Sequence, residues 1–176
     1  MKELPLQPRQ IFQVYDAGLR PDQHPPARNP FPGVVVLIED RGRVLLGRRA
    51  EGRFLGGRWC LPGGFIEYGE DFLSAGLREV REETGLDVRI ESILSVVSNF
   101  LTPKLHTLVV VLLAHLVSVR ESARPGDDID ALAWHPLEGP FPEMAFDADS
   151  HIISRFHATH LDGAPVDERF SALRVI

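Results

Sequence analysis

The sequence has only one cysteine, Cys60, among its 176 residues. One thiol cannot form a disulfide within the chain, and it cannot supply the set of thiolates that a multi-cysteine zinc site needs. A disulfide-stabilised secreted domain is therefore excluded, and we expect a reducing, cytoplasmic setting.

Long apolar runs and excess positive charge are also missing. The longest apolar run, Leu108 to Ala114, is far shorter than the roughly 20 residues of a membrane-spanning helix. Residues 1–10 carry two prolines and several charges without an apolar core, so we expect no signal peptide. A formal net charge of −6 argues against general affinity for nucleic acid or anionic membranes. A small anionic substrate held by local arginines remains compatible with this charge.

What is present fits one globular domain with flanking segments. With 44% hydrophobic and 25% charged residues, the composition is that of a soluble globular protein, and the length suits one domain. We expect a proline-rich N-terminal arm over residues 1–32, a domain over 33–160 and a C-terminal tail over 161–176. The arm has a short apolar stretch near Phe12, and we interpret it as structural or as a dimer contact. The tail is expected to dock through Phe170 and Leu173.

Apolar periodicity predicts a mixed α/β domain. Val34 to Ile38 is a short β-branched run typical of a buried strand, and residues 40–42 form a turn signal before a second strand, Val44 to Leu46. Further strands are expected over 86–97 (with a break), 105–119 and 131–135, and helices over 71–84 and 147–160. In the first helix, Leu73, Gly76, Leu77 and Val80 form an apolar stripe that should pack on the sheet, and Gly85 should end the helix.

The same helix carries three glutamates, Glu79, Glu82 and Glu83, at helical positions i, i+3 and i+4. Their side chains should share an arc of roughly 100°. On an open surface they would form an ordinary solvated acidic face. In a cleft, two carboxylates about 6 Å apart repel by roughly 3 kcal/mol at an effective dielectric constant near 20. Such a cluster would take up protons or a hard divalent cation such as Mg²⁺ or Mn²⁺.

Six arginines fall within eighteen positions of the chain, and they have two interpretations. They form either a solvated basic face or a phosphate-binding set, since a guanidinium group matches phosphate oxygens with two parallel hydrogen bonds. Arg49 and Arg58 are our candidates for substrate binding. The six are Arg41, Arg43, Arg48, Arg49, Arg53 and Arg58.

The acidic helix lies within a longer motif that resembles the signature of the Nudix (MutT-like) hydrolases, G-x5-E-x7-R-E-U-x-E-E-x-G-U with U apolar. All nine specified positions match: Gly64, Glu70, Arg78, Glu79, Val80, Glu82, Glu83, Gly85 and Leu86. The resemblance implies an α/β/α sandwich around a mixed β-sheet. It also implies hydrolysis, with Mg²⁺ or Mn²⁺, of a nucleoside diphosphate linked to another group.

By position, the resemblance implies that Glu79 and Glu83 are the principal metal ligands, with the Gly63 carbonyl nearby. Glu82 would bind a second metal or orient the attacking water. Gly64, Glu70, Arg78 and Gly85 would then be structural, with Glu70 and Arg78 bracing the motif through an ion pair.

A general base is still required, and two sources are open. One is Glu82, and the other is an acid outside the motif among residues 127–130, where we choose Asp128 as the candidate; its alternative role is a simple turn-forming acid. Three aromatic side chains either stack on a base or ribose or belong to the core, and Phe100 is our candidate for a substrate contact. The three are Phe100, Trp134 and Phe146.

Residues 29–32 and 62–67 resemble the catalytic half of the NADH pyrophosphatase and ADP-ribose pyrophosphatase branch, without its zinc ribbon. The segment Ser95 to Thr102 lacks that branch's S-Q-P-W-P-F-P sequence, so we expect ADP-ribose or a related nucleotide-linked diphosphate as substrate rather than NADH. Two alternatives are a Nudix-fold nucleotide sensor without catalysis and a triphosphatase of oxidised nucleotides. The resemblance also makes a homodimer plausible.

Overall fold

The structure, a computed structural model, describes residues 29–102, 105–160 and 162–166. Most of the predicted arm (residues 1–28) lies outside the described residues, as do Phe170 and Leu173 of the predicted tail. The elements are β1 (Phe31–Asp40), β2 (Arg43–Arg49), β3 (Trp59–Cys60), β4 (Gly63–Phe65), α2 (Phe72–Thr84), β5 (Val88–Thr102), β6 (Leu105–Leu116), a 3₁₀ turn η2 (Arg120–Ser122), β7 (Ile129–Pro136), α3 (Asp147–Thr159) and β8 (Ala164–Pro165).

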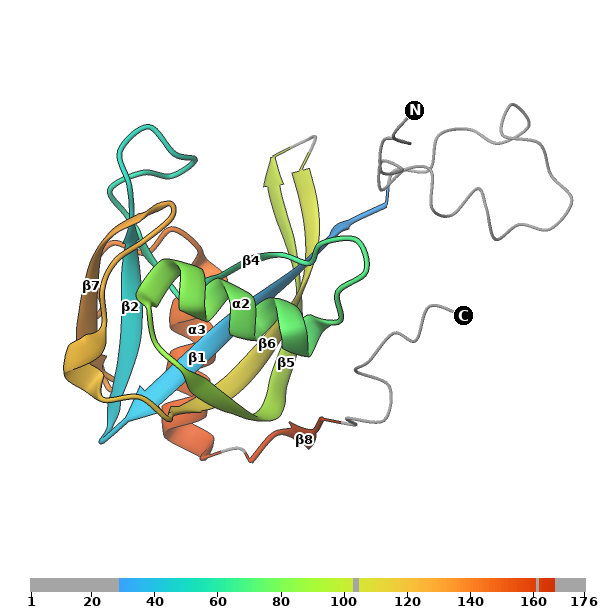
Figure 1. Cartoon of the computed structure of the whole chain (residues 1–176). Helices are drawn as coiled ribbons and strands as arrows, with labels where there is room; N and C mark the ends of the chain where they lie inside the picture. The colour runs from blue at the N-terminus through green and yellow to red at the C-terminus, as the bar shows by residue number, and fades with distance from the viewer. Residues whose placement is uncertain (1–28, 103–104, 161, 167–176) are drawn as a thin grey trace, which may run out of the picture.

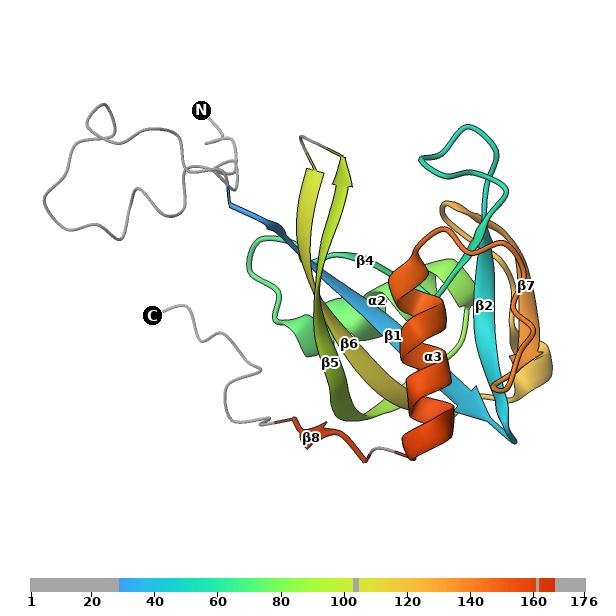
Figure 2. The same ribbon diagram turned by 180° about the vertical axis from the view of Figure 1, so that it is seen from behind.

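The strands form one mixed sheet, and α2 and α3 cover its opposite faces (Figures 1 and 2). The strand order is β3-β2-β1-β6-β5-β8, with β4 also paired to β1 and β7 to β2. Only the pairing of β1 with β6 is parallel, and the remaining pairs are antiparallel. This arrangement confirms the predicted α/β sandwich with a central mixed sheet.

β1 is the centre of the fold because both of its faces are buried. Val34, Val36 and Ile38 point to the α2 side, where they pack with Ala75 and Val80 of the helix. Leu37 belongs to the second core on the α3 side. A strand covered on both faces has no polar face, and this explains the continuous apolar run that predicted it.

β1 pairs with β6 along nine residues of one edge. Its other edge, called the divided edge below, pairs with two different strands, and the cavity described below lies beside it. On the divided edge, β4 pairs with Gly33 to Val35, whereas β2 pairs only with Glu39 and Asp40. The segment that leads into β4 therefore lies between β1 and β2, held by the Val36 N–H donating to the Pro62 carbonyl at 2.8 Å.

Gly85 ends α2 as expected, and Asp71 adds an N-terminal cap that was not predicted. The Asp71 carboxylate caps the N-terminus by accepting hydrogen bonds from the N–H groups of Leu73 and Ser74. Gly85 ends the helix in the left-handed conformation, with φ of 66°, which glycine adopts at little cost.

The predicted apolar stripe of α2 is only partly correct. Gly76 and Val80 are buried, but Leu77 is 39% exposed. A Cβ atom on Gly76 would lie 2.9 Å from the Leu112 side chain, so the missing side chain lets the helix approach the sheet closely along this line. The buried face is therefore centred on Gly76 and Val80 and continues into Glu79 and Glu83 rather than into the leucines.

The other elements predicted from the sequence are partly confirmed. The hairpin of β1 and β2, the long strands β5 and β6, the strand β7 and the helix α3 are all present. β5 is one continuous strand with three register shifts, so the expected break and the expected end of the strand at Val97 are wrong. The short elements β3, β4, η2 and β8 were not predicted. β1 begins at Phe31 and β8 ends at Pro165. The domain limits of 33 and 160 stay a prediction.

No helix in the described part of the chain is long and apolar enough to cross a membrane.

Candidate active site

A cavity of about 370 Å³ opens beside the divided edge of β1. Its walls combine β1 and β4 with the C-terminal half of α2, the β5–β6 hairpin, the turn before β7 and the first turns of α3. Its volume lies within the range of small-molecule sites in proteins.

Two of the three motif glutamates of α2 line this cavity. Glu79 is 8% exposed and Glu83 is 1% exposed, and both border the cavity. The Glu82 side chain is 49% exposed and is not among the residues of the cavity wall. Because the helix buries the line through Gly76 and Val80, the i and i+4 positions point inward and i+3 points outward.

Glu83 is held at the base of the cavity by backbone and by a second acid. The Gly63 N–H donates to its carboxylate at 2.8 Å. Burial, together with the hydrogen bond and the like charge of the neighbouring Asp128 carboxyl, raises the pKa of Glu83 to about 9. Near neutral pH, Glu83 therefore holds a proton when no cation compensates its charge.

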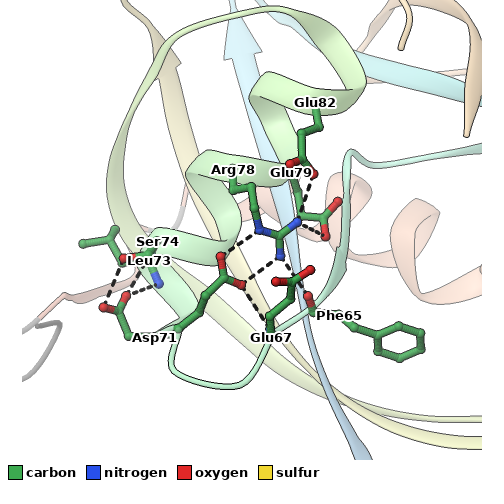
Figure 3. A network of polar contacts seen from close by, with 9 residues as sticks. Phe65, Glu67, Asp71, Leu73, Ser74, Arg78, Glu79 and Glu82 are labelled. Atoms are coloured by element: carbon green, nitrogen blue, oxygen red, sulfur yellow. Dashed lines mark hydrogen bonds and ion pairs between the residues drawn. The ribbon is translucent and has the colours of Figure 1, made fainter. Parts of the chain in front are cut away.

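Arg78 connects the other acids of the motif (Figure 3). Its guanidinium group binds Glu70 through two parallel hydrogen bonds of 2.7 and 2.8 Å, and it reaches Glu79 at 2.8 Å and Glu82 at 3.0 Å. It also donates to the Phe65 carbonyl at 3.1 Å. The hydrogen bonds from Arg78 lower the pKa of Glu70, whereas burial raises the pKa of Glu79 despite the same partner.

Arg49 and Asp128 form an ion pair on the cavity wall. Arg49 Nη2 lies 2.8 Å from Asp128 Oδ2, and Arg49 Nε donates to the Phe54 carbonyl at 2.7 Å. Both side chains line the cavity. The structure therefore brings the predicted outside acid to within reach of Glu83.

The structure does not bring the other two predicted substrate contacts into the cavity. Arg58 pairs with Glu143 at 2.9 Å on the surface. Phe100 is 77% exposed and stacks on His106, because strand alternation points it to the face opposite Asn99. Among the other aromatic candidates, Phe146 lines the cavity, and Trp134 lies beneath the Arg120 guanidinium instead.

One buried acid of the cavity wall was not predicted from the sequence. Asp149, in the first turn of α3, is 4% exposed and accepts a hydrogen bond from the Leu61 N–H at 3.0 Å. Burial raises its pKa to about 7. The sequence offers only weak signals for this role, namely an acid in the first turn of an expected helix, where the helix dipole favours negative charge.

The described residues contain no ready-made cluster of three or more His, Cys, Asp or Glu side chains arranged to hold a metal ion. The motif glutamates already have partners within the protein: Arg78 donates hydrogen bonds to Glu79 and Glu82, and Glu83 is hydrogen-bonded to the Gly63 N–H and to Asp128. The chemistry of the donors nevertheless fits a hard divalent cation. Burial raises the pKa values of the Glu79 and Glu83 carboxyl groups on the cavity wall. A divalent cation would neutralise the negative charge of these carboxylates in place of protons.

Comparison with known proteins gives a consistent result. Residues 29–156 match the family model of the NUDIX domain. The chain is 35% identical over 125 residues to an ADP-ribose pyrophosphatase of Methanocaldococcus jannaschii, covering 70% of this chain and 72% of that protein. It is also 33% identical over 129 residues to the NAD-capped RNA hydrolase NudC of Pseudomonas aeruginosa, covering 72% of this chain but only 44% of that protein.

Solved structures extend the similarity to the fold. The crystal structure of a NUDIX hydrolase from Nitrosomonas europaea superimposes with a TM-score of 0.67 at 26% identity, covering 83% of this chain and 81% of that one. A MutT NUDIX hydrolase from Burkholderia pseudomallei gives a TM-score of 0.63 at 29% identity, covering 72% of this chain and 97% of that one.

Proposed function

The chain belongs to the Nudix hydrolase family, and on this premise we propose that it hydrolyses the diphosphate of ADP-ribose or of a related nucleotide-linked diphosphate. One observation carries the proposal: Glu79 and Glu83 lie buried on the wall of a cavity whose volume is in the range of small-molecule sites. The choice of ADP-ribose rests on the 35% identity to an ADP-ribose pyrophosphatase.

We assign Mg²⁺ or Mn²⁺ binding to Glu79 and Glu83, supported by the Gly63 carbonyl, with Glu82 available for a second ion. When bound, such a cation neutralises diphosphate charge and lowers the pKa of a coordinated water. Arg78 orients the Glu79 and Glu82 carboxylates, and Glu70 fixes Arg78 in turn. The Gly63 N–H fixes the Glu83 carboxylate.

Asp128 is the better candidate for the general base. It lines the cavity and is oriented by Arg49, whereas the Glu82 side chain lies half-exposed outside the cavity wall. A carboxylate in this place removes a proton from the attacking water, and the oriented Arg49 guanidinium holds a phosphate oxygen. In-line attack at phosphorus otherwise needs mainly positioning, which the fixed side chains supply.

Two other functions give different outcomes in one experiment. The protein is incubated with Mg²⁺ and ADP-ribose, NADH, dinucleoside polyphosphates, nucleotide sugars and deoxynucleoside triphosphates, while AMP and pyrophosphate release are followed. AMP release from ADP-ribose is expected. Pyrophosphate release from triphosphates would favour the oxidised-nucleotide triphosphatase, and binding without any cleavage would favour the sensor.

The metal assignment has its own test. EDTA is expected to abolish hydrolysis of the best substrate, and excess Mg²⁺ or Mn²⁺ is expected to restore it. Undiminished turnover in EDTA would refute the metal mechanism. Homodimerisation remains a prediction, and an elution volume of a monomer in sizing chromatography would refute it.

A further inference from the structure

The β5–β6 hairpin forms an apolar wall of the cavity that carries two polar side chains. Asn99 of β5 and Thr107 of β6 are directly opposite each other in the strand register, so they lie side by side on one face. Both border the cavity. The other hairpin residues that border it are all aliphatic: Val97, Leu101, Leu105, Val109 and Val111.

Neither polar group of this pair is satisfied by the described part of the protein. Thr107 is 4% exposed, and its hydroxyl oxygen is buried without a hydrogen-bond partner among the described residues. The Asn99 amide makes no side-chain hydrogen bond to the described residues either. A buried hydroxyl without a partner destabilises a fold. Of the buried polar atoms without a partner among the described residues, only that of Thr107 belongs to a residue of the cavity wall, where a ligand can supply the missing hydrogen bond.

We propose that Asn99 and Thr107 determine substrate specificity by hydrogen-bonding the edge of the nucleobase of the substrate. This inference rests on the proposed function, because it concerns the group that occupies the same cavity during diphosphate hydrolysis. The Thr107 hydroxyl oxygen is buried in the structure, so its contact with a base requires rotation of the side chain about χ1.

The aliphatic and uncharged polar side chains of this wall suit a nucleobase better than the ribose or diphosphate of the proposed substrate. Aliphatic side chains contact the faces of an aromatic ring favourably, and an amide offers a donor and an acceptor that match the edge of a heterocycle. A phosphate is not expected at this wall, because none of the hairpin residues that border the cavity carries a charge. The arginine of the cavity wall, Arg49, lies on β2 beside Asp128 instead.

The test uses two nearly isosteric substitutions and a matched control. Thr107→Val removes the hydroxyl, and Asn99→Leu removes the amide with little change in volume. Ser92→Ala is the control, because Ser92 also has a buried hydroxyl without a partner on β5 but lies away from the cavity. Adenosine is the probe, since it carries no phosphate and its binding requires neither a metal nor hydrolysis.

Adenosine binding to the wild type and to Ser92→Ala is measured by calorimetry or by ligand-observed NMR, and both should bind alike. Thr107→Val and Asn99→Leu should each weaken binding roughly tenfold, which is the effect of one net hydrogen bond. With the best diphosphate substrate, the same variants should raise KM by a similar factor and leave kcat within about twofold.

Thermal unfolding separates a binding role from a structural one. Thr107→Val should unfold at the wild-type temperature or above, since it removes an unsatisfied buried hydroxyl. Unchanged adenosine binding in Thr107→Val, no binding to the wild type, a lowered unfolding temperature, or an equal loss in Ser92→Ala would each overturn the proposal. The two proposals can be refuted separately. If the protein binds adenosine through Asn99 and Thr107 but cleaves no diphosphate, the proposed function is wrong and the proposed nucleobase site stands.

Discussion

The two helices α2 and α3 place a buried acid on the same short segment from opposite faces of the sheet. Both helices contain 13 residues. Glu83 of α2 accepts from the Gly63 N–H, and Asp149 of α3 accepts from the Leu61 N–H, two residues earlier. The two carboxyls therefore hold the entry to β4 between them, and both have raised pKa values.

The surroundings of the two acids differ. Glu83 has Asp128 as an acidic neighbour and lies one helical turn from Glu79, so oxygen donors accumulate around it. Asp149 accepts only the Leu61 N–H among the hydrogen bonds of the described residues. Burial alone thus raises the pKa of a carboxyl, but a second acid beside it is what suits the place for a cation. We therefore propose a chemical role for Glu83 and a structural role for Asp149.

The largest expected effect separates these two roles. Glu83→Gln and Asp149→Asn each replace an ionisable carboxyl by an amide and keep an oxygen that can accept the same backbone N–H. We expect Glu83→Gln to lower kcat at least about 100-fold, because an electrostatic contribution to the reaction is lost. Asp149→Asn should retain activity within about threefold.

Steady-state kinetics with the best substrate of the panel measures both values, with circular dichroism as a check that each variant is folded. Full activity in Glu83→Gln would refute the metal assignment. An equally large loss in Asp149→Asn would remove the distinction between the helices.

The next effect concerns Arg78 of α2, which binds Glu79, whereas the Asp149 carboxylate of α3 accepts only a backbone N–H among the described residues. Arg78→Ala leaves the buried Glu79 without its cation, and breaking a buried ion pair costs about 3 to 5 kcal/mol. Arg78 is partly exposed, so we expect a smaller loss of unfolding free energy of about 2 to 3 kcal/mol. Arg78→Lys is the control: it keeps the charge but loses the two parallel bonds to Glu70, and it should recover only part of the loss. Urea unfolding measures all three proteins, and equal stability of Arg78→Ala and the wild type would contradict the proposed bracing.

A third prediction uses the raised pKa of Asp149. In the unfolded chain an aspartate ionises near pH 4, whereas in the folded protein Asp149 holds its proton up to about pH 7. Between these values the folded state binds more protons, so this group makes stability fall as the pH rises. The stability it contributes is fully present below pH 4 and is lost by about pH 8.

Asp149→Asn should therefore be more stable than the wild type at pH 8, by roughly 2 kcal/mol, and the difference should vanish at pH 4. This figure is smaller than the full shift implies, because Asp149 borders a cavity that admits water. Urea unfolding of both proteins at several pH values gives the difference directly. A difference that does not depend on pH would show that ionisation of Asp149 is not the cause.

The parts of the fold that follow from local patterns could be predicted from the sequence. The apolar run of β1 and the helix end at Gly85 each depend on neighbouring residues alone, and the structure contains both. β3 and β4 could not be predicted, since strands of two and three residues show no periodicity and exist only through pairing with β2 and β1.

The cavity depends on register and on distant contacts, which a sequence pattern does not specify. A register shift between Arg48 and Arg49 in the β2–β7 pair helps decide which arginine reaches the cavity. Three shifts in β5 likewise decide that Asn99 faces inward and Phe100 outward. Asp149 lies 88 residues from Leu61 in the chain, so only the folded structure brings them together.

The smallest expected effect tests how the two helices begin. Asp71 caps α2 through the N–H groups of Leu73 and Ser74, whereas Phe146 at the same position of α3 makes no side-chain cap. Asp71→Ala should cost about 1 kcal/mol of unfolding free energy, because two N–H groups lose their acceptor.

Asp71→Asn keeps an oxygen acceptor and should cost less than half as much, so the two variants distinguish loss of the cap from loss of charge near the helix dipole. Urea unfolding at neutral pH measures the differences, and kcat for the best substrate should stay within about twofold, because Asp71 lies at the end of α2 remote from Glu79 and Glu83. An equal loss in both variants would attribute the effect to charge. An unchanged stability in Asp71→Ala would show that packing on the sheet alone fixes the start of α2, as it must for the uncapped α3.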